Sequence, residues 1–259
     1  MSFMNEQKQS VDLGDVEIAY YDIGEGIPVL LLHGFASTAA VNWLSTGWIK
    51  VLNEAGFRCI ALDHRGHGDS TKFYTADDYG PDIFARDAVR LLDQLGVEKC
   101  HVVGFSMGAR ITAWMCHAHP ERIDRAVFGG MGARMTNTAS DYSAVAHALE
   151  TDDLSSIASP EAATFRTFAD RVGADRFALA ACIRPSRQKI TAEIIAGITT
   201  RVLVAVGDED EIGGSATELA NQMQNADGFD MPGLDHMRST GAKPFKERTV
   251  SFLKEGSIV

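Results

Sequence analysis

The stretch Gly104-Phe105-Ser106-Met107-Gly108 decides the fold of this chain. An apolar run at residues 100–105 leads into it and predicts a buried strand, while residues 107–119 continue with a helical pattern. A serine on so sharp a strand-to-helix turn must take a strained backbone conformation, and the flanking glycines remove side chains that would clash. The turn lifts the hydroxyl clear of the sheet and leaves the amide of Met107 at a helix N-terminus. We therefore expect Ser106 to be a nucleophile with an anion-binding amide beside it.

Strands and helices alternate on both sides of this turn. The hydrophobic pattern predicts further strands at 16–21, 28–32, 57–62, 126–129 and 201–206, and helices at 43–56, 82–95, 215–225 and 244–255. Such alternation predicts an α/β fold with a doubly wound, mostly parallel sheet.

Residues 134–197 differ from the rest, because they carry helical patterns at 162–172 and 176–183 but no convincing strand. A helical insertion between core strands lies over the carboxyl ends of the sheet, where such folds bind ligands. We expect residues 134–197 to form a helical cap and residues 1–133 and 198–259 to form the core.

A candidate acid and a candidate base follow the serine in the chain. The apolar strand at 201–206 ends in Gly207-Asp208-Glu209-Asp210, and His236 is the only histidine after position 147. A neutral imidazole can take the serine proton, and a buried carboxylate fixes its tautomer. The residues alone leave both Asp208 and Asp210 open as the acid. His64 and His67 precede the serine in the chain, and we expect no direct catalytic role for them.

Two loops supply candidate donors for a developing oxyanion. His33-Gly34-Phe35 ends the strand at 28–32, and Gly34 allows a close backbone approach. Acyl transfer needs two backbone donors aimed at the oxyanion, and we expect the amides of Phe35 and Met107 to supply them. We also expect the side chains of Phe35 and Met107 to line the substrate pocket.

Together these segments, with the run DHRGHGDS at residues 63–70, resemble the α/β-hydrolase family over nearly the whole chain. The chain is most similar to bacterial carboxylesterases, cofactor-free haloperoxidases (perhydrolases), and lactone and C–C hydrolases. The resemblance implies a Ser106–His236–Asp210 triad, because the acid of such families usually stands three residues after the strand-ending glycine. It implies no metal and no organic cofactor. A departure is Glu211-Ile212, where the family often has a proline shortly after the acid.

The motifs favour hydrolysis of small to medium carboxylic esters through an acyl-serine intermediate. A lactonase, C–C bond hydrolase, thioesterase or perhydrolase would use the same residues, and a ligand receptor with little turnover is the alternative outside enzymes. A serine at position 106 disfavours haloalkane dehalogenases and epoxide hydrolases, which resemble this fold but use an aspartate nucleophile.

Composition limits the partners. A net charge of −11 disfavours nucleic acid and the anionic membrane surface. No run approaches the roughly 18 apolar residues of a spanning helix, and residues 1–14 lack the apolar core of a signal peptide.

The four cysteines show no CxxC spacing, and we expect reduced, buried thiols in a cytoplasmic protein. We expect surface histidines rather than a metal site at residues 116–119. The sequence does not set the oligomeric state.

Five arginines stand in the predicted cap, namely Arg166, Arg171, Arg176, Arg184 and Arg187. One interpretation pairs them with nearby acids such as Asp170 and Asp175. The other turns one or two of them into the cleft to hold a substrate carboxylate, for which the guanidinium fork is suited. Both interpretations stay open at this point.

Overall fold

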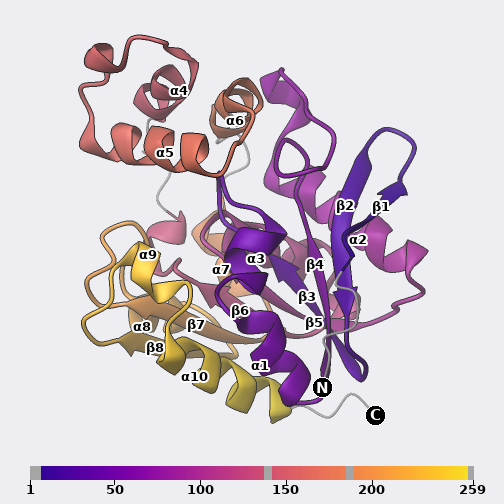
Figure 1. Cartoon of the computed structure of the whole chain (residues 1–259). Helices are drawn as coiled ribbons and strands as arrows, with labels where there is room; N and C mark the ends of the chain where they lie inside the picture. Colours follow the sequence, from indigo (N-terminus) through magenta and orange to yellow (C-terminus); the bar gives the residue numbers. More distant parts are fainter. Residues whose placement is uncertain (1–6, 137–141, 185–189, 256–259) are drawn as a thin grey trace.

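The computed structural model describes residues 7–136, 142–184 and 190–255 and contains one eight-stranded sheet (Figure 1). Its strands are β1 Gln9–Asp12, β2 Glu17–Ile23, β3 Ile27–Leu32, β4 Phe57–Leu62, β5 Cys100–Phe105, β6 Ile123–Gly129, β7 Arg201–Gly207 and β8 Ala226–Met231. They are ordered β1-β2-β4-β3-β5-β6-β7-β8. All pairs from β4 to β8 are parallel, whereas β1 and β2 are antiparallel. The predicted mostly parallel sheet is confirmed.

Helices cover both faces of the sheet, and the alternation of side chains along each strand explains why. In β3, Leu30 and Leu32 belong to one core cluster while Val29 and Leu31 belong to the other. The first face packs against α2 Pro81–Gln94, α3 Met107–Ala118, α7 Ala192–Gly197 and α8 Ala216–Ala220. The second packs against α1 Trp48–Glu54 and α10 Lys243–Lys254. A strand buried on both faces needs the continuous apolar sequence that β3 has.

The prediction of one helix over 43–56 is wrong. A π-helical turn η1, Ala40–Leu44, comes first, and α1 starts only at Trp48. Gly47 separates the two with a φ of 77°, a left-handed conformation that glycine adopts without steric cost. The break lets the rings of Trp43 and Trp48 meet edge to face at 5.6 Å, both fully buried. The Asn42 side chain of η1 accepts from the Gly34 amide at 3.1 Å, which ties η1 to the loop after β3.

Helices α4 Ser143–Glu150, α5 Pro160–Arg171 and α6 Arg176–Ile183 stand apart from the sheet (Figure 1). They share an apolar cluster that also includes Phe35 and Ala36 of the loop after β3. These three helices are called the cap below. Side chains cap two of them, since Ser159 accepts from the amide of Ala162 and Asp175 from that of Ala178. Helix α7 also lies within 134–197, but it packs on α3 and buries Ile195 in the core cluster on the first face of the sheet, called the main core below. Because of this packing, α7, at the end of the predicted insertion 134–197, belongs to the core and not to the cap.

The remaining short elements are the 3-10 turns η2 Ala76–Asp78, η3 Pro120–Arg122, η4 Ala133–Thr136 and η5 Leu154–Ser156, and the short helix α9 His236–Ser239. Among the helices of the described ranges, none combines the length and hydropathy that crossing a bilayer requires.

Candidate active site

The turn after β5 holds Ser106 in a strained conformation, with φ 55° and ψ −112°. The chain keeps it there because the Ser106 amide donates to the Gly129 carbonyl at 2.8 Å. A Cβ on Gly108 would collide with the Leu32 carbonyl, and one on Gly104 with the Gly108 carbonyl. The two flanking glycines are therefore required by close backbone approach, and the serine side chain stands free at the carboxyl end of the sheet.

The structure brings Ser106, His236 and Asp210 into one hydrogen-bonded chain. His236 Nε2 lies 3.0 Å from Ser106 Oγ, and His236 Nδ1 lies 2.7 Å from Asp210 Oδ2. The Asp210 side chain is fully buried, and its Oδ1 accepts from the amides of Ile212 and Gly213 at 2.9 and 2.8 Å. A carboxylate only accepts, so His236 Nδ1 carries the proton and Nε2 is left to accept from the serine hydroxyl.

Asp208, the other candidate acid, points elsewhere. It is exposed, and its Oδ1 accepts from the amide of Gly233 at 2.7 Å. The family's acid usually stands three residues after the strand-ending glycine, here Gly207. This spacing therefore identified the carboxylate that contacts His236.

The loop after β3 carries the Phe35 amide, one of the two predicted oxyanion donors. The Gly34 carbonyl accepts from His33 Nδ1 at 2.8 Å and from the Ser37 amide at 3.2 Å. In a trans peptide the N–H points opposite to the C=O, so the Phe35 amide faces away from these donors. A Cβ on Gly34 would lie 3.4 Å from Ser106 Cβ, so this loop packs against the serine.

The Met107 amide opens α3 and has no acceptor within the helix. Neither this amide nor that of Phe35 has a hydrogen-bond partner among the described residues. Both amides are thus left for a ligand.

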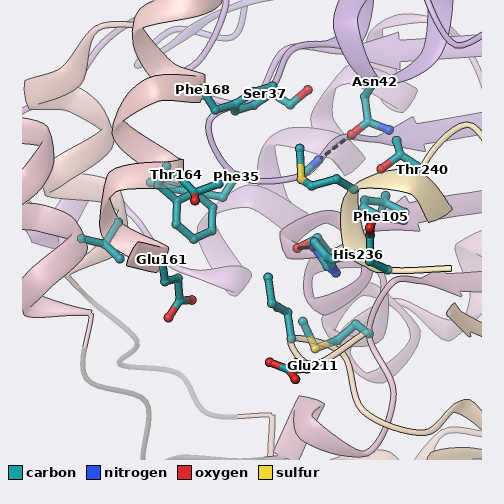
Figure 2. Close-up of a pocket in the computed structure, with 18 of the residues that line it drawn as sticks. Phe35, Ser37, Asn42, Phe105, Glu161, Thr164, Phe168, Glu211, His236 and Thr240 are labelled. Carbon is teal, nitrogen blue, oxygen red and sulfur yellow. Dashed lines mark hydrogen bonds between the residues drawn. The ribbon is translucent and has the colours of Figure 1, made fainter. Parts of the chain in front are cut away.

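A cavity of about 840 Å³ opens between the sheet and the cap at this point. In Figure 2, Glu161, Thr164 and Phe168 enter it from the cap, opposite Asn42, Thr240 and His236. Its apolar lining includes Phe35, whose ring meets that of Phe165 edge to face at 5.6 Å. Met107 is not among the lining residues, and its side chain packs against the main core, so its predicted role in the pocket is not supported.

The cap arginines do not form a carboxylate clamp. Arg166 donates to Asp170 at 2.8 Å and to carbonyls of the cap, Arg176 pairs with Asp152 at 3.2 Å, and Arg184 binds Glu150 with both Nη atoms. Arg171 is exposed, and none of these four lines the cavity. Arg187 lies outside the described residues. For the four described arginines the structure does not support the clamp interpretation, and three of them pair with nearby acids, as the other interpretation holds.

Two arginines that the sequence reasoning passed over do line the cavity. Arg110, one helical turn after Ser106, donates to the carbonyls of Met135 and Arg134 at 2.8 and 3.2 Å. Arg134 in turn donates to the Glu211 carbonyl. The pair ties η4 to α3 and to the loop after β7. In the sequence, the one-turn spacing between Ser106 and Arg110 could have indicated that the two side chains lie on the same side of the helix, toward the cavity.

His33, His64 and His67 form a buried cluster next to the loop after β3, with ring centroids of His33 lying 4.4 and 5.1 Å from the other two. Burial lowers the pKa of all three and brings that of His67 to about 3, so the cluster is neutral at neutral pH. Asp63 accepts from the amides of Ala39 and Asp69 at 2.7 and 3.0 Å. None of these residues lines the cavity, and their contacts brace the loops.

All four cysteines are buried and free, and burial raises the pKa of Cys59, Cys100 and Cys116 to about 12. These thiols stay protonated and are inert. Within the described ranges, no three His, Cys, Asp or Glu side chains gather as metal ligands would.

Comparison with known proteins shows the family to which the chain belongs. The family model described as "alpha/beta hydrolase fold" matches residues 27–181, more than half of the chain. A putative non-heme chloroperoxidase of Synechocystis sp. is 36% identical over 43% of this chain and 39% of its own length. Epoxide hydrolase 3 of Siraitia grosvenorii is 34% identical over 44% of this chain and 35% of its own length. The aligned segments thus span well under half of these relatives.

Solved structures match over nearly the full length. A meta-cleavage product hydrolase of Pseudomonas fluorescens superposes with a TM-score of 0.72 at 22% identity, covering 96% of this chain and 98% of that chain. A bromoperoxidase of Bacillus anthracis has a TM-score of 0.72 at 24% identity, covering 96% of this chain and 100% of that chain. At such identities the likeness concerns the fold. With the family model running from the start of β3 into α6 and the sheet order as described, this chain belongs to the α/β-hydrolase fold family.

Proposed function

We propose that this protein is a serine hydrolase that cleaves small to medium carboxylic esters through an acyl-serine intermediate. The observation that carries the proposal is the unbroken hydrogen-bonded chain from Ser106 Oγ through His236 to buried Asp210. The free amides of Phe35 and Met107 beside the same serine support it, because acyl transfer needs donors where negative charge develops. The proposal needs neither a metal nor an organic cofactor.

In the first half of the reaction, Ser106 Oγ attacks the ester carbonyl carbon while His236 Nε2 takes the hydroxyl proton. The carbonyl oxygen becomes an oxyanion and accepts from the amides of Phe35 and Met107. The adduct then collapses, the bond to the alcohol oxygen breaks, and His236 gives its proton to that oxygen. In the second half, water loses a proton to His236 and its oxygen bonds to the acyl carbon, which gives a second adduct. The bond between that carbon and Ser106 Oγ then breaks, His236 gives its proton to Oγ, and the acid is released.

The test is the hydrolysis of p-nitrophenyl esters by the parent chain and by Ser106→Ala. We expect turnover by the parent and a loss of at least about a thousandfold in the variant, with its unfolding midpoint unchanged. A parent that is inactive on these esters would contradict the proposed ester hydrolysis. Variant turnover within about tenfold of the parent would remove Ser106 from the nucleophile position.

A perhydrolase is the second candidate, favoured by the 36% identity to a putative non-heme chloroperoxidase. Here hydrogen peroxide replaces water as the attacker of the acyl-serine, and the product is a peracid. Incubation with acetate and hydrogen peroxide, followed by a peracid assay, separates the two candidates. Peracid formation that requires Ser106 and exceeds ester hydrolysis would favour the perhydrolase.

A further inference from the structure

Arg110 is a half-buried cation in the wall of the cavity. Its Nη1 and Nη2 donate to the carbonyls of Met135 and Arg134 in η4. A guanidinium carries five N–H groups, so these two bonds leave three of them unused, and no described residue accepts from them. The enclosed side-chain atoms without a partner include Nε of Arg125 but not Nε of Arg110, which therefore stays accessible. A ligand in the cavity can accept from it.

The charge of Arg110 has no partner either. No acidic side chain of the described ranges pairs with it, whereas Arg166, Arg176 and Arg184 of the cap each hold an acid. Burial lowers the pKa of the Arg110 guanidinium, and the group that acts in the opposite direction is the hydroxyl of Tyr142, another residue of the cavity wall. A charge held partly out of water without a counter-charge costs free energy, so it calls for an explanation.

The carboxylates around the cavity do not supply that counter-charge. Four of them line it, namely Glu161, Glu209, Glu211 and Asp235. The three glutamates are exposed, so water and salt screen their charges. Asp235 accepts from the Arg238 amide at 2.8 Å at the start of α9. The positive charge of Arg110 is thus left for an anionic group that enters with a ligand.

Arg110 also stands close to the nucleophile. Its amide donates to the Ser106 carbonyl at 3.3 Å, one helical turn away. Side chains lean toward the N-terminus of their own helix, which for α3 is the Ser106 end. Residues one turn apart have Cβ atoms about 5–6 Å from each other. An anionic group held by Arg110 therefore lies only a few bonds from a carbonyl carbon that Ser106 attacks.

We propose that Arg110 is a specificity-determining residue whose free N–H groups bind a carboxylate of the substrate. The planar guanidinium suits this group, because it can donate to both carboxylate oxygens at once. The substrate class is then an ester that carries a carboxylate a few bonds from the scissile carbonyl. The carboxylate stands on either the acyl or the alcohol part, which the two arms of the experiment distinguish. This inference rests on the proposed ester hydrolysis.

The test uses two pairs of esters, each of which compares a carboxylate with its methyl ester. The acyl pair is mono-p-nitrophenyl adipate and p-nitrophenyl methyl adipate. The alcohol pair is 4-carboxyphenyl butyrate and 4-(methoxycarbonyl)phenyl butyrate. The readout is the ratio of kcat/KM within a pair, charged over neutral, compared between parent and variant, so that the intrinsic reactivity of each ester cancels.

Three variants are compared with the parent. Arg110→Gln removes the charge and keeps a donor for η4, whereas Arg110→Lys keeps the charge and loses the fork. Arg171→Gln is the matched control, because Arg171 is exposed and does not line the cavity. We expect the ratio of at least one pair to fall by about tenfold to a hundredfold in Arg110→Gln, the worth of a hydrogen bond to a charged group.

The ratio should fall less in Arg110→Lys and stay within about twofold of the parent in Arg171→Gln. Ratios within about twofold of the parent in both pairs for Arg110→Gln would overturn the role of Arg110, while Ser106-dependent hydrolysis of the neutral esters stood.

The parent alone supplies a second test, which does not depend on the folding of a variant. The chain has a net charge of −11, so without a bound counter-charge it repels a carboxylate ester and added salt relieves the repulsion. With Arg110 in the proposed role, the charged member of one pair is the better substrate and salt reduces its advantage. A parent that prefers the neutral member of both pairs would overturn the inference. A parent that hydrolyses none of the four esters would overturn the proposed function, and this inference with it.

Discussion

Replacing Asp210 by Asn perturbs the proposed catalytic chain by a single group. In the parent, Asp210 Oδ1 already accepts from the amides of Ile212 and Gly213, and Oδ2 faces His236. The two amides hold the oxygen of the new side chain on their side, so its NH₂ group must face His236 Nδ1. Nδ1 then becomes the acceptor and Nε2 carries the proton, which leaves no base for the Ser106 hydroxyl.

The expected loss in kcat is about 10⁴-fold for Asp210→Asn, the effect known for a wrongly held tautomer, or about 5 kcal/mol in barrier height. Asp208→Asn is the matched control, since Asp208 lies two residues away and its side chain accepts a hydrogen bond from the Gly233 amide and not from His236. It should change kcat by less than about threefold, within the range of an exposed substitution. Steady-state rates on p-nitrophenyl butyrate, with circular dichroism as a fold control, decide the matter. A larger loss for Asp208→Asn than for Asp210→Asn would refute the reasoning.

Further predictions concern stability and substrate size. Gly108→Ala drives a Cβ into the Leu32 carbonyl and should lower the free energy of unfolding by about 2 kcal/mol or more in urea titrations; an unchanged midpoint would contradict this. Because burial lowers the pKa of His33, His64 and His67, the unfolded chain takes up protons first as pH falls below about 6.5. Stability should therefore fall from about pH 6.5 toward about pH 5, and less steeply in His67→Gln; equal slopes would count against the cluster. A cavity of about 840 Å³ under a short cap should favour short-chain esters over long-chain triglycerides in rate profiles, and the reverse preference would exclude this size limit.

The parts of the fold that sequence predicts well are the buried ones. β4 and β5 start and end where expected, because strands covered on both faces need unbroken apolar runs. β8 was missed, since Ala226–Met231 contains two aspartates and a glycine and lies at the sheet edge, where one side of the strand has no neighbour. β1, at the other edge, is polar for the same reason. Pattern reasoning is weakest where the chain does not have to be apolar.

Some residues of the candidate site could be assigned from the sequence, and others could not. Ser106, Asp210 and His236 could be assigned because each follows an element whose end the sequence marks, and their order is informative. Asn42 and Arg110 could not, because their roles depend on contacts with segments that tertiary folding brings close. The cap arginines failed as a clamp because acids and carbonyls within the cap satisfy them first. Charge counted along a sequence does not reveal which partner a side chain will find.

The measurement that tests the central claim most directly is covalent labelling by a fluorophosphonate followed by peptide mass mapping. The probe reacts with a serine only when a neighbouring base removes its proton and the oxyanion is stabilised. The account predicts a single adduct on Ser106, formed by the parent and absent from Ser106→Ala, with labelling slowed strongly in Asp210→Asn and unchanged in Asp208→Asn. An adduct on another residue, or no adduct in a folded parent, would contradict it.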